Sequence, residues 1–551
     1  MPLTHPHTAG IAATLIARPL VAFTAACLVH GVALAAAALP TPPKTFDTTY
    51  AAPKGATLTV AAGGDLQAAL EKAQLGDTIV LEAGASWTGP FKLPNKAAGS
   101  GWIYVVSSHL SDLPPAGSRV SPTNAASMPK ILAPNRATAL TTVANSNHFR
   151  FVGIEFAQAS GATQVYQVIS IGNTDTSPAT LPSYIVFDRC YVHGDPKANS
   201  RRGIEMDGAY VAVVDSYISD FQEVGADSQG LWAYNTSGPL KIVDNYIEAA
   251  SENVMFGGAD SKAPSLVPAD IEIRNNHLFK PLSLIGSNLV PKNLLEFKAA
   301  QRALVTGNTF QNSPAGGQTG FAILITPRNQ DGKALWSLTT DITIAGNTLI
   351  NVGSGFNILG TDNFSPTSPP TQRILIRDNV IGVTGLNGSA GRAFQIVGAG
   401  GSDYTIDHNT VINTALPPNH QLSAVMMAET KAPKVNNFTF TNNLATTTSW
   451  GFTGSGVGQG TATLNAYFTN WVFSKNVLMN APAGAFPPGS FFPSDPGQVR
   501  FVNYSGANYA LAADSPYKSA GTDGKDIGAD LSLAPGASAV MPNPPINVIV
   551  K

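Results

Sequence analysis

The stretch LKIVDNYI at residues 240–247 is followed by IEIRNNHL at residues 271–278, and both read apolar-x-apolar-x-x-Asn-x-apolar. Two earlier copies of the pattern carry Cys190 and Ser216 in place of the asparagine. Later copies have their asparagine at Asn308, Asn347, Asn379, Asn409, Asn443 and Asn476. Successive copies lie about 32 residues apart, which is the spacing of a repeat architecture.

The length of this repeat selects among the repeat folds. Propeller blades need about 40–45 residues and four strands each, whereas a coil of three short strands and three turns needs fewer. An asparagine at one turn position can also stack on its copies as a ladder of side-chain amides. The repeat therefore predicts an all-β parallel β-helix, a solenoid of about ten or more coils.

The composition agrees with such a solenoid and excludes other classes. Lys and Arg number 33 against 35 Asp and Glu, a net charge of −2, so we expect no nucleic-acid partner. Charged residues make up 12% of the chain, about half the usual ~25%. Coils that pair their own backbone and line their turns with amides need few charged residues. We also expect the protein to be a monomer.

The two ends of the chain predict its organisation. Arg18, the apolar residues 20–34 and a run of alanines form a signal peptide over residues 1–38, so we expect a secreted or periplasmic protein without a membrane span. Residues 39–57 are predicted to be a linker, and residues 58–530 the β-helix domain. Residues 63–76 predict a capping helix, with Asp65 near its start. Residues 531–551 form a tail rich in Pro and Ala.

The cap, the strand that begins at Gly76-Asp77-Thr78-Ile79, the asparagine turns and the ending from Leu511 to Gly524 resemble the pectate-lyase-like right-handed β-helix superfamily. The resemblance covers residues 58–530. It implies the fold, but not one activity, because this fold hosts lyases, hydrolases, esterases and adhesins.

The strand before each asparagine turn can be aligned by its apolar residues, which predicts the residues that face outward. We align residues 204–207, 231–234, 254–257, 295–298, 322–325 and 357–360. The outward positions then hold Glu205, Asp207, Trp232, Tyr234, Met255, Gly257, Glu296 and Lys298. Aromatic rings suit sugar stacking, so this patch predicts a site for an acidic polysaccharide; an ordinary solvated face is the alternative.

Glu296-x-Lys298 resembles the chondroitinase B and alginate lyase type of polysaccharide lyase, in which a catalytic lysine follows metal-binding acids. The resemblance implies β-elimination with Lys298 as base and Arg328 as the catalytic arginine of the next coil. A lysine base must be neutral, whereas Glu296 favours its charged form; bound calcium would take up that negative charge. Glu252, Asn293 and Glu296 are the candidate calcium ligands. The chain departs from that type in the spacing of its acids and in Asn329, where the type has His.

Other interpretations remain open from the sequence. Lys298 could form only a surface salt bridge with Glu296. Glu205 and Asp207 stand about 6.6–6.8 Å apart along one strand, a separation suited to an inverting glycoside hydrolase. His193 and Arg202 are expected in a loop before Glu205, where they could bind a substrate carboxylate. Trp232 and Tyr234 alone would suffice for a non-catalytic binding or adhesion module.

Overall fold

The structure is a computed structural model that describes residues 37–96, 101–172, 175–414 and 423–533. The predicted signal peptide, up to residue 36, lies outside the described residues. No helix in the described part is both long enough and apolar enough to cross a membrane.

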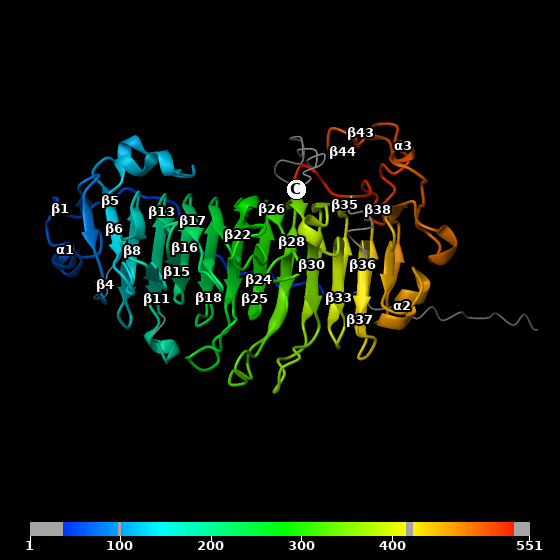
Figure 1. Ribbon diagram of the computed structural model, residues 1–551, viewed down its shortest axis with the longest axis horizontal. Helices are drawn as coiled ribbons and strands as arrows, with labels where there is room; N and C mark the ends of the chain where they lie inside the picture. Colours follow the sequence, from blue (N-terminus) through cyan, green and yellow to red (C-terminus); the bar gives the residue numbers. More distant parts are fainter. Residues whose placement is uncertain (1–36, 97–100, 173–174, 415–422, 534–551) are drawn as a thin grey trace, which may run out of the picture. The chain divides into compact units, whose positions relative to one another are not determined.

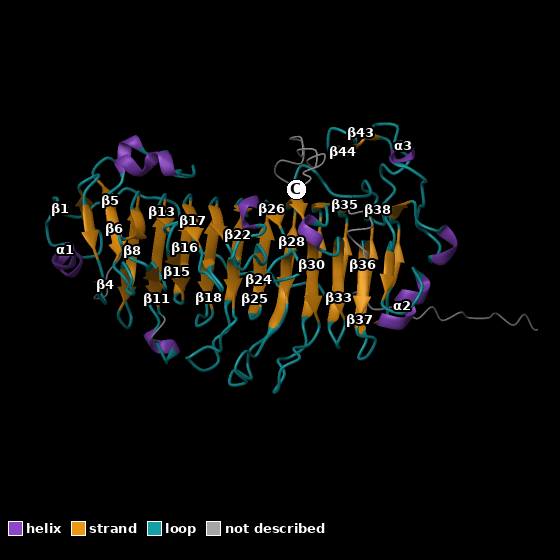
Figure 2. Cartoon of the chain, in the orientation of Figure 1, coloured by secondary structure: helices purple, strands orange, loops and turns teal. Residues whose placement is uncertain are grey.

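Three long parallel sheets form the domain, and most coils contribute one strand to each of them (Figures 1 and 2). Sheet A has 15 strands: β1 (Thr57–Val60), β2 (Thr78–Leu81), β5 (Ile103–Ser107), β8 (Asn147–Val152), β12 (Ser183–Asp188), β16 (Ala209–Val214), β19 (Leu240–Val243), β22 (Ala269–Arg274), β25 (Ala300–Thr306), β28 (Thr339–Ala345), β31 (Gln372–Arg377), β34 (Ser402–Asp407), β37 (Val435–Thr441), β40 (Phe468–Thr469) and β41 (Val472–Ser474).

Sheet B follows the asparagine turn and has 13 strands: β3 (Ser86–Thr88), β6 (Lys130–Ala133), β9 (Glu155–Gln158), β13 (Tyr191–His193), β17 (Tyr217–Phe221), β20 (Tyr246–Ala249), β23 (His277–Phe279), β26 (Thr309–Ser313), β29 (Thr348–Val352), β32 (Val380–Val383), β35 (Thr410–Asn413), β38 (Leu444–Thr446) and β42 (Val477–Met479). Sheet C has 12 strands: β4 (Phe91–Leu93), β7 (Leu140–Thr142), β11 (Ile169–Ile171), β15 (Arg202–Met206), β18 (Gln229–Ala233), β21 (Glu252–Phe256), β24 (Leu295–Phe297), β27 (Phe321–Ile325), β30 (Ser354–Leu359), β33 (Arg392–Val397), β36 (Ala424–Glu429) and β39 (Phe452–Gly454). The predicted right-handed parallel β-helix is confirmed.

The core is built from columns of apolar residues that repeat at one register position from coil to coil. One such column on sheet A consists of Ile242, Ile273, Val305, Ile344, Ile376, Ile406 and Phe440. All seven are buried, because alternate residues of each strand point inward and parallel pairing stacks each of them on its counterpart.

The predicted amide ladder runs along the turns between sheets A and B. Asn245 donates its backbone N–H and its side-chain Nδ2 to Oδ1 of Asn276, at 2.8 and 2.9 Å. The same double contact repeats up to Asn476. At the early end Ser216 takes the asparagine position, since its Oγ accepts from the backbone of Cys190 at 2.9 Å.

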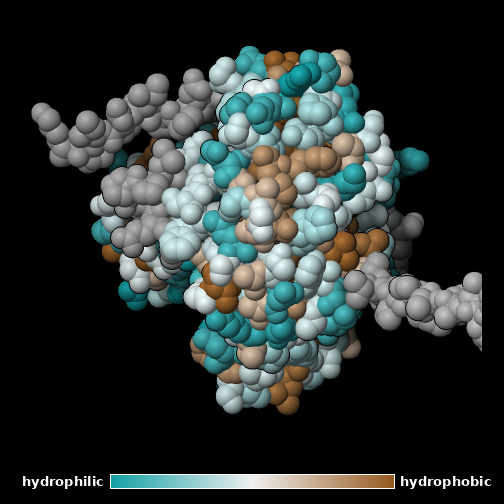
Figure 3. Space-filling view, turned by 90° about the vertical axis from the view of Figure 1, so that its right-hand side faces the viewer, coloured by the Kyte–Doolittle hydropathy of each residue, from teal (hydrophilic) through white to brown (hydrophobic). Residues whose placement is uncertain are grey.

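Helices cover both ends of the stacked coils. Helix α1 (Leu66–Lys72) lies within the predicted residues 63–76; Asp65 caps it by accepting a hydrogen bond from the N–H of Ala68. Strand β1 precedes this helix and was not predicted. At the other end, α2 (Thr461–Tyr467) buries Leu464 and Tyr467 against the core. Figure 3 shows that this end presents mostly hydrophilic and intermediate residues with small separate hydrophobic groups.

Residues 39–57, predicted to be a linker, instead begin as an extended strap along sheet A. The backbone N–H groups of Ala38, Thr41 and Lys44 donate to the carboxylates of Asp403, Asp341 and Asp270, at 3.1, 2.9 and 2.9 Å. These aspartates lie two coils apart, about 9.6 Å. Three residues of polyproline II helix span about 9.3 Å, so the Pro-rich strap matches every second coil.

The last described residues also fold back along the coils. Beyond α3 (Pro496–Val499), strands β43 (Phe501–Asn503) and β44 (Asn508–Leu511) form a hairpin. The N–H of Gly528 then donates to the carbonyl oxygen of Asn442 at 2.8 Å. Residues 531–533 of the predicted tail are described, and residues 534–551 lie outside the described part. The remaining short elements are β10 (Gln164–Val165), β14 (Asn199–Ser200), η1 (Leu110–Asp112), η2 (Pro122–Ser127), η3 (Pro178–Thr180), η4 (Leu282–Leu284), η5 (Leu386–Gly388) and η6 (Ala483–Ala485).

Candidate functional site

The outer face of sheet C carries the residues that the sequence singled out. The register places Glu205, Trp232, Met255, Glu296, Leu324 and Asn357 in one column. The sequence alignment is therefore correct over β15, β18, β21 and β24. It is wrong by one residue over β27 and β30, where Leu324 and Asn357 face outward. Strand β27 reads FAILI and is buried throughout, so its sequence has no polar alternation that could set the register.

A groove of about 770 Å³ lies over this face, and Glu296, Lys298 and Arg328 line it together. Its apolar lining includes Leu324, Leu359 and Val397. The remaining residues that line the groove are Gln318, Thr319, Phe321, Thr326, Asn357, Thr361, Asp362, Asn363, Ala399, Thr430 and Pro433. A hollow with an apolar lining and a few convergent charged groups is the usual form of a ligand site.

Lys298 follows β24 and lies beside the acid of its own strand. Its Nζ is 3.4 Å from Oε1 of Glu296, and its side chain is 15% exposed. Glu296 is buried and also accepts from Nδ2 of Asn293 at 3.0 Å and from Oγ1 of Thr326 at 3.3 Å. The predicted Glu296–Lys298 pair is therefore present, and it lies in the groove.

Arg328 follows β27, on the coil next to Lys298, and its backbone N–H donates to the carbonyl oxygen of Lys298 at 2.9 Å. Its guanidinium stacks on the ring of Phe364, 4.2 Å from the ring centre, and its Nε is 3.5 Å from Oδ1 of Asp362. That Nε is buried and has no hydrogen-bond acceptor. The structure thus brings the predicted base and the predicted arginine together.

The three predicted calcium ligands are neighbours, but their surroundings do not fit the ion. Glu252 lies 3.4 Å from Nζ of Lys292, and Nε2 of Gln229 donates to its other oxygen at 2.7 Å. Asn293 turns its amide nitrogen, not its oxygen, to Glu296. No group of three or more His, Cys, Asp or Glu residues that could hold a metal occurs among the described residues. Calcium needs six to eight oxygen ligands, so this set is unsuitable for it.

Glu205 and Asp207 lie on the face as predicted, but both side chains are fully buried. Oγ of Ser170 donates to Glu205 at 2.6 Å. Oδ1 of Asp207 accepts from the backbone N–H groups of Tyr234 and Asn235 at 2.7 and 2.8 Å, and its Oδ2 has no hydrogen-bond partner. Burial and the nearby Glu205 raise the pKa of Asp207 well above its usual range. A carboxyl pair enclosed in this way has no access to a sugar in solution.

Trp232 and Tyr234 point outward from the sheet, but the expectation of exposed stacking platforms is wrong. They are 8% and 5% exposed, because they stack on each other at 4.5 Å and pack with Met255. The guanidinium of Arg202 covers the Trp232 ring at 4.2 Å and donates to Oε1 of Gln229 at 2.7 Å. The ring faces that a sugar would use are occupied by protein groups.

His193 lies on another sheet, so its expected place beside Glu205 is wrong. It ends β13 of sheet B, where its Nε2 lies 3.1 Å from Oε1 of Glu155 and its ring stacks on Tyr191. Arg202 is the first residue of β15 rather than a loop residue. The short segment between them contains a turn to the next sheet, which the sequence pattern did not reveal.

The sequence also missed two partners of the site. Lys292 and Asp362 each form an ion pair with a predicted site residue, Glu252 and Arg328 respectively. Both stand outside the regular strand pattern, in the segments that precede β24 and follow β30. Because the chain has few charged residues, a possible pairing of opposite charges is the one signal in the sequence that could have indicated Lys292 and Asp362.

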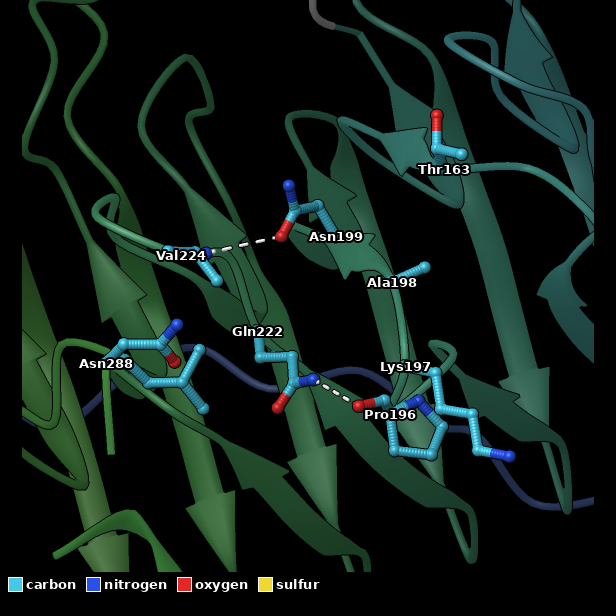
Figure 4. A pocket seen from close by; sticks show the side chains of 9 residues that line it. Thr163, Pro196, Lys197, Ala198, Asn199, Gln222, Val224 and Asn288 are labelled. Atoms are coloured by element: carbon cyan, nitrogen blue, oxygen red, sulfur yellow. Dashed lines mark hydrogen bonds between the residues drawn. The ribbon is translucent and has the colours of Figure 1, made fainter. Parts of the chain in front are cut away.

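A second cavity, of about 470 Å³, opens among turns near β14 and β17 (Figure 4). It is bordered by two hydrogen bonds, from the N–H of Val224 to Oδ1 of Asn199 and from Nε2 of Gln222 to the carbonyl of Pro196. Lys197 is the charged residue among those that line it, and no carboxylate does. It lacks the paired charged groups of the groove on sheet C.

Comparison with known proteins shows likeness in structure but not in sequence. No family model matches the chain. No curated protein matches it either. Among solved structures, the PL6 family alginate lyase AlyGC has 13% identity and a TM-score of 0.48, over 86% of this chain and 58% of its own. A mannuronic acid specific family 6 lyase from human gut microbiota has 12% identity and a TM-score of 0.48, over 81% and 93%.

Pectate lyase Pel9A has 13% identity and a TM-score of 0.31, over 86% of this chain and 96% of its own. The likeness to AlyGC covers 58% of that lyase, so this chain spans little more than half of its length. At 12–13% identity these likenesses concern the fold alone. The predicted superfamily is confirmed as a fold, through the three parallel sheets.

Proposed function

We propose that this chain is an exported enzyme that binds a uronic-acid-containing polysaccharide in the groove and cleaves it by β-elimination. One observation carries the proposal: Lys298 and Arg328 line the same groove from neighbouring coils, each beside a carboxylate at ion-pair distance, 3.4 and 3.5 Å. These distances are long for hydrogen bonds, so both cations keep N–H groups available for an acidic sugar.

β-Elimination needs a base that removes a proton from the sugar and a cation that stabilises the negative charge formed on the sugar carboxylate. Lys298 first loses one ammonium proton to water; its amine then takes the proton from the carbon next to the sugar carboxylate, and the electron pair forms a carbon–carbon double bond as the glycosidic C–O bond breaks. The leaving oxygen then takes a proton from water, and Lys298 is again an ammonium group. Arg328 stays charged and stabilises the negative charge that builds up on the carboxylate.

The test is the ultraviolet absorbance of the new double bond, measured with the full chain on alginate, pectate and glycosaminoglycans. We expect a rise with at least one of them. Lys298→Ala and Arg328→Ala should each lower its rate by about a hundredfold or more. Lys431→Ala is the matched control, because Lys431 is an exposed lysine between Thr430 and Pro433, which line the same groove.

Other results would contradict β-elimination and indicate a different function. New reducing ends without the double bond would indicate a glycoside hydrolase. Binding of a polysaccharide without either product would indicate a binding or adhesion module. A rate that survives in Lys298→Ala would remove this lysine from the reaction.

A further inference from the structure

We infer that the ammonium group of Lys292 takes the place of a bound divalent cation, and that this chain holds no calcium between Glu252 and Glu296. The charges of this site are then balanced by protein groups alone, whether or not the groove catalyses β-elimination.

Lys292 bridges acids that come from separate parts of the chain. It lies in the segment before β24 and pairs with Asp227, from the segment before β18, and with Glu252, the first residue of β21. The distance from its Nζ to Oε1 of Glu252 is 3.4 Å. A single cation thus joins two neighbouring coils and a loop, which is the structural role that a metal ion would have.

Burial makes such a cation necessary. Glu252 is fully buried and Lys292 is 13% exposed. A buried carboxylate without a nearby positive charge is strongly destabilising. Glu296, also buried, has Lys298 at its other side. The two lysines flank β24, so each buried glutamate has an ammonium group of its own.

Hydrogen-bond donors face Oε2 of Glu252 and both oxygens of Glu296, whereas Oε1 of Glu252 has Lys292 Nζ at 3.4 Å and no hydrogen-bond partner. Glu252 accepts from Nε2 of Gln229, and Glu296 accepts from Nδ2 of Asn293 and Oγ1 of Thr326. A calcium ion needs oxygen atoms with lone pairs directed at it. Donor groups directed at the carboxylates, together with the two ammonium groups, supply the positive charge instead.

The experiment measures thermal unfolding of the full chain with calcium chloride, with magnesium chloride and with EDTA. We expect the wild-type Tm to be the same in all three. Lys292→Ala should lower the Tm by roughly 5 °C, and calcium should restore part of this loss. Lys292→Arg keeps the positive charge and should remain insensitive to calcium. Lys431→Ala, at an exposed position, should behave as the wild type.

Two outcomes would overturn the inference. One is calcium binding by the wild-type chain, seen by calorimetric titration with calcium alone and abolished by Glu252→Gln. The other is a Lys292→Ala variant with unchanged Tm. If Lys292→Ala does not fold, the double variant Glu252→Gln with Lys292→Gln removes both charges. It should fold with a Tm near that of the wild type, and its failure to fold would equally count against the inference.

Discussion

Asn276 and Asn308 lie on successive coils and are joined by two hydrogen bonds, from the backbone N–H and from Nδ2 of Asn276 to Oδ1 of Asn308, both 2.9 Å long. Both residues are buried. Each rung of the ladder therefore satisfies a turn backbone that water cannot reach. This explains how coils with so few charges stay paired at their tightest bend.

We expect Asn308→Ala to lower the free energy of unfolding by about 3 kcal/mol, because it leaves the buried donors of Asn276 without an acceptor. Asn308→Ser should cost less, since Ser216 serves in the equivalent turn. Urea unfolding followed by circular dichroism measures both. Asn436→Ala, at an exposed asparagine of β37, is the control, and an equal loss there would contradict the role of the ladder.

Lys280 is a buried lysine whose ammonium group holds a turn together. Its Nζ donates to the carbonyl oxygens of Ala249 and Ala250, at 2.9 and 3.1 Å, to that of Ser251, and to Oδ1 of Asn253 at 2.8 Å. Lys280→Met should lower the unfolding free energy by about 3 kcal/mol or more, since these oxygens lose their donor.

The exposed Lys72→Met is the matched control for that change and should cost less than about 0.5 kcal/mol. The comparison uses urea unfolding midpoints at one pH. Similar midpoints for the two variants would show that Lys280 is dispensable for the turn.

The buried carboxyl group of Asp207 predicts that stability falls as pH rises. Its folded-state pKa is raised, first by burial and then by Glu205. A group of this kind stabilises the fold fully below its unfolded pKa of about 3.9, and the contribution is lost as pH rises through the folded pKa. The wild type should therefore lose stability relative to Asp207→Asn as pH increases above about 4. Parallel curves from pH 4 to pH 9, measured as urea midpoints, would mean that Asp207 is ionised throughout.

The strap along sheet A can be tested by removing one donor without changing its backbone form. Thr41→Pro keeps the polyproline II conformation but deletes the N–H that donates to Asp341 at 2.9 Å. We expect a loss of about 1 kcal/mol and faster proteolysis between residues 37 and 50. Leu39→Pro is the control because Leu39 is 65% exposed. Equal proteolysis of both variants would show that this hydrogen bond does not hold the strap.

The sequence by itself determined the repeat, the fold and the ladder, because their signals are periodic. An asparagine that recurs about every 32 residues beside alternating apolar positions leaves one way to stack the coils. It also placed Glu205, Asp207, Glu296 and Lys298 on one outward face, since alternation within a strand sets the side on which a residue lies. Where alternation fails, as in β27, the register could not be predicted.

Only the tertiary structure decided which outward residues can meet a ligand. Trp232, Tyr234, Glu205 and Asp207 face away from the core, yet packing covers them, whereas Lys298 and Arg328 reach an open groove. The ion pair of Lys292 with Glu252 joins separate coils, so no local pattern contains it. Exposure and charge pairing depend on which loops fold over a face, and those loops do not repeat.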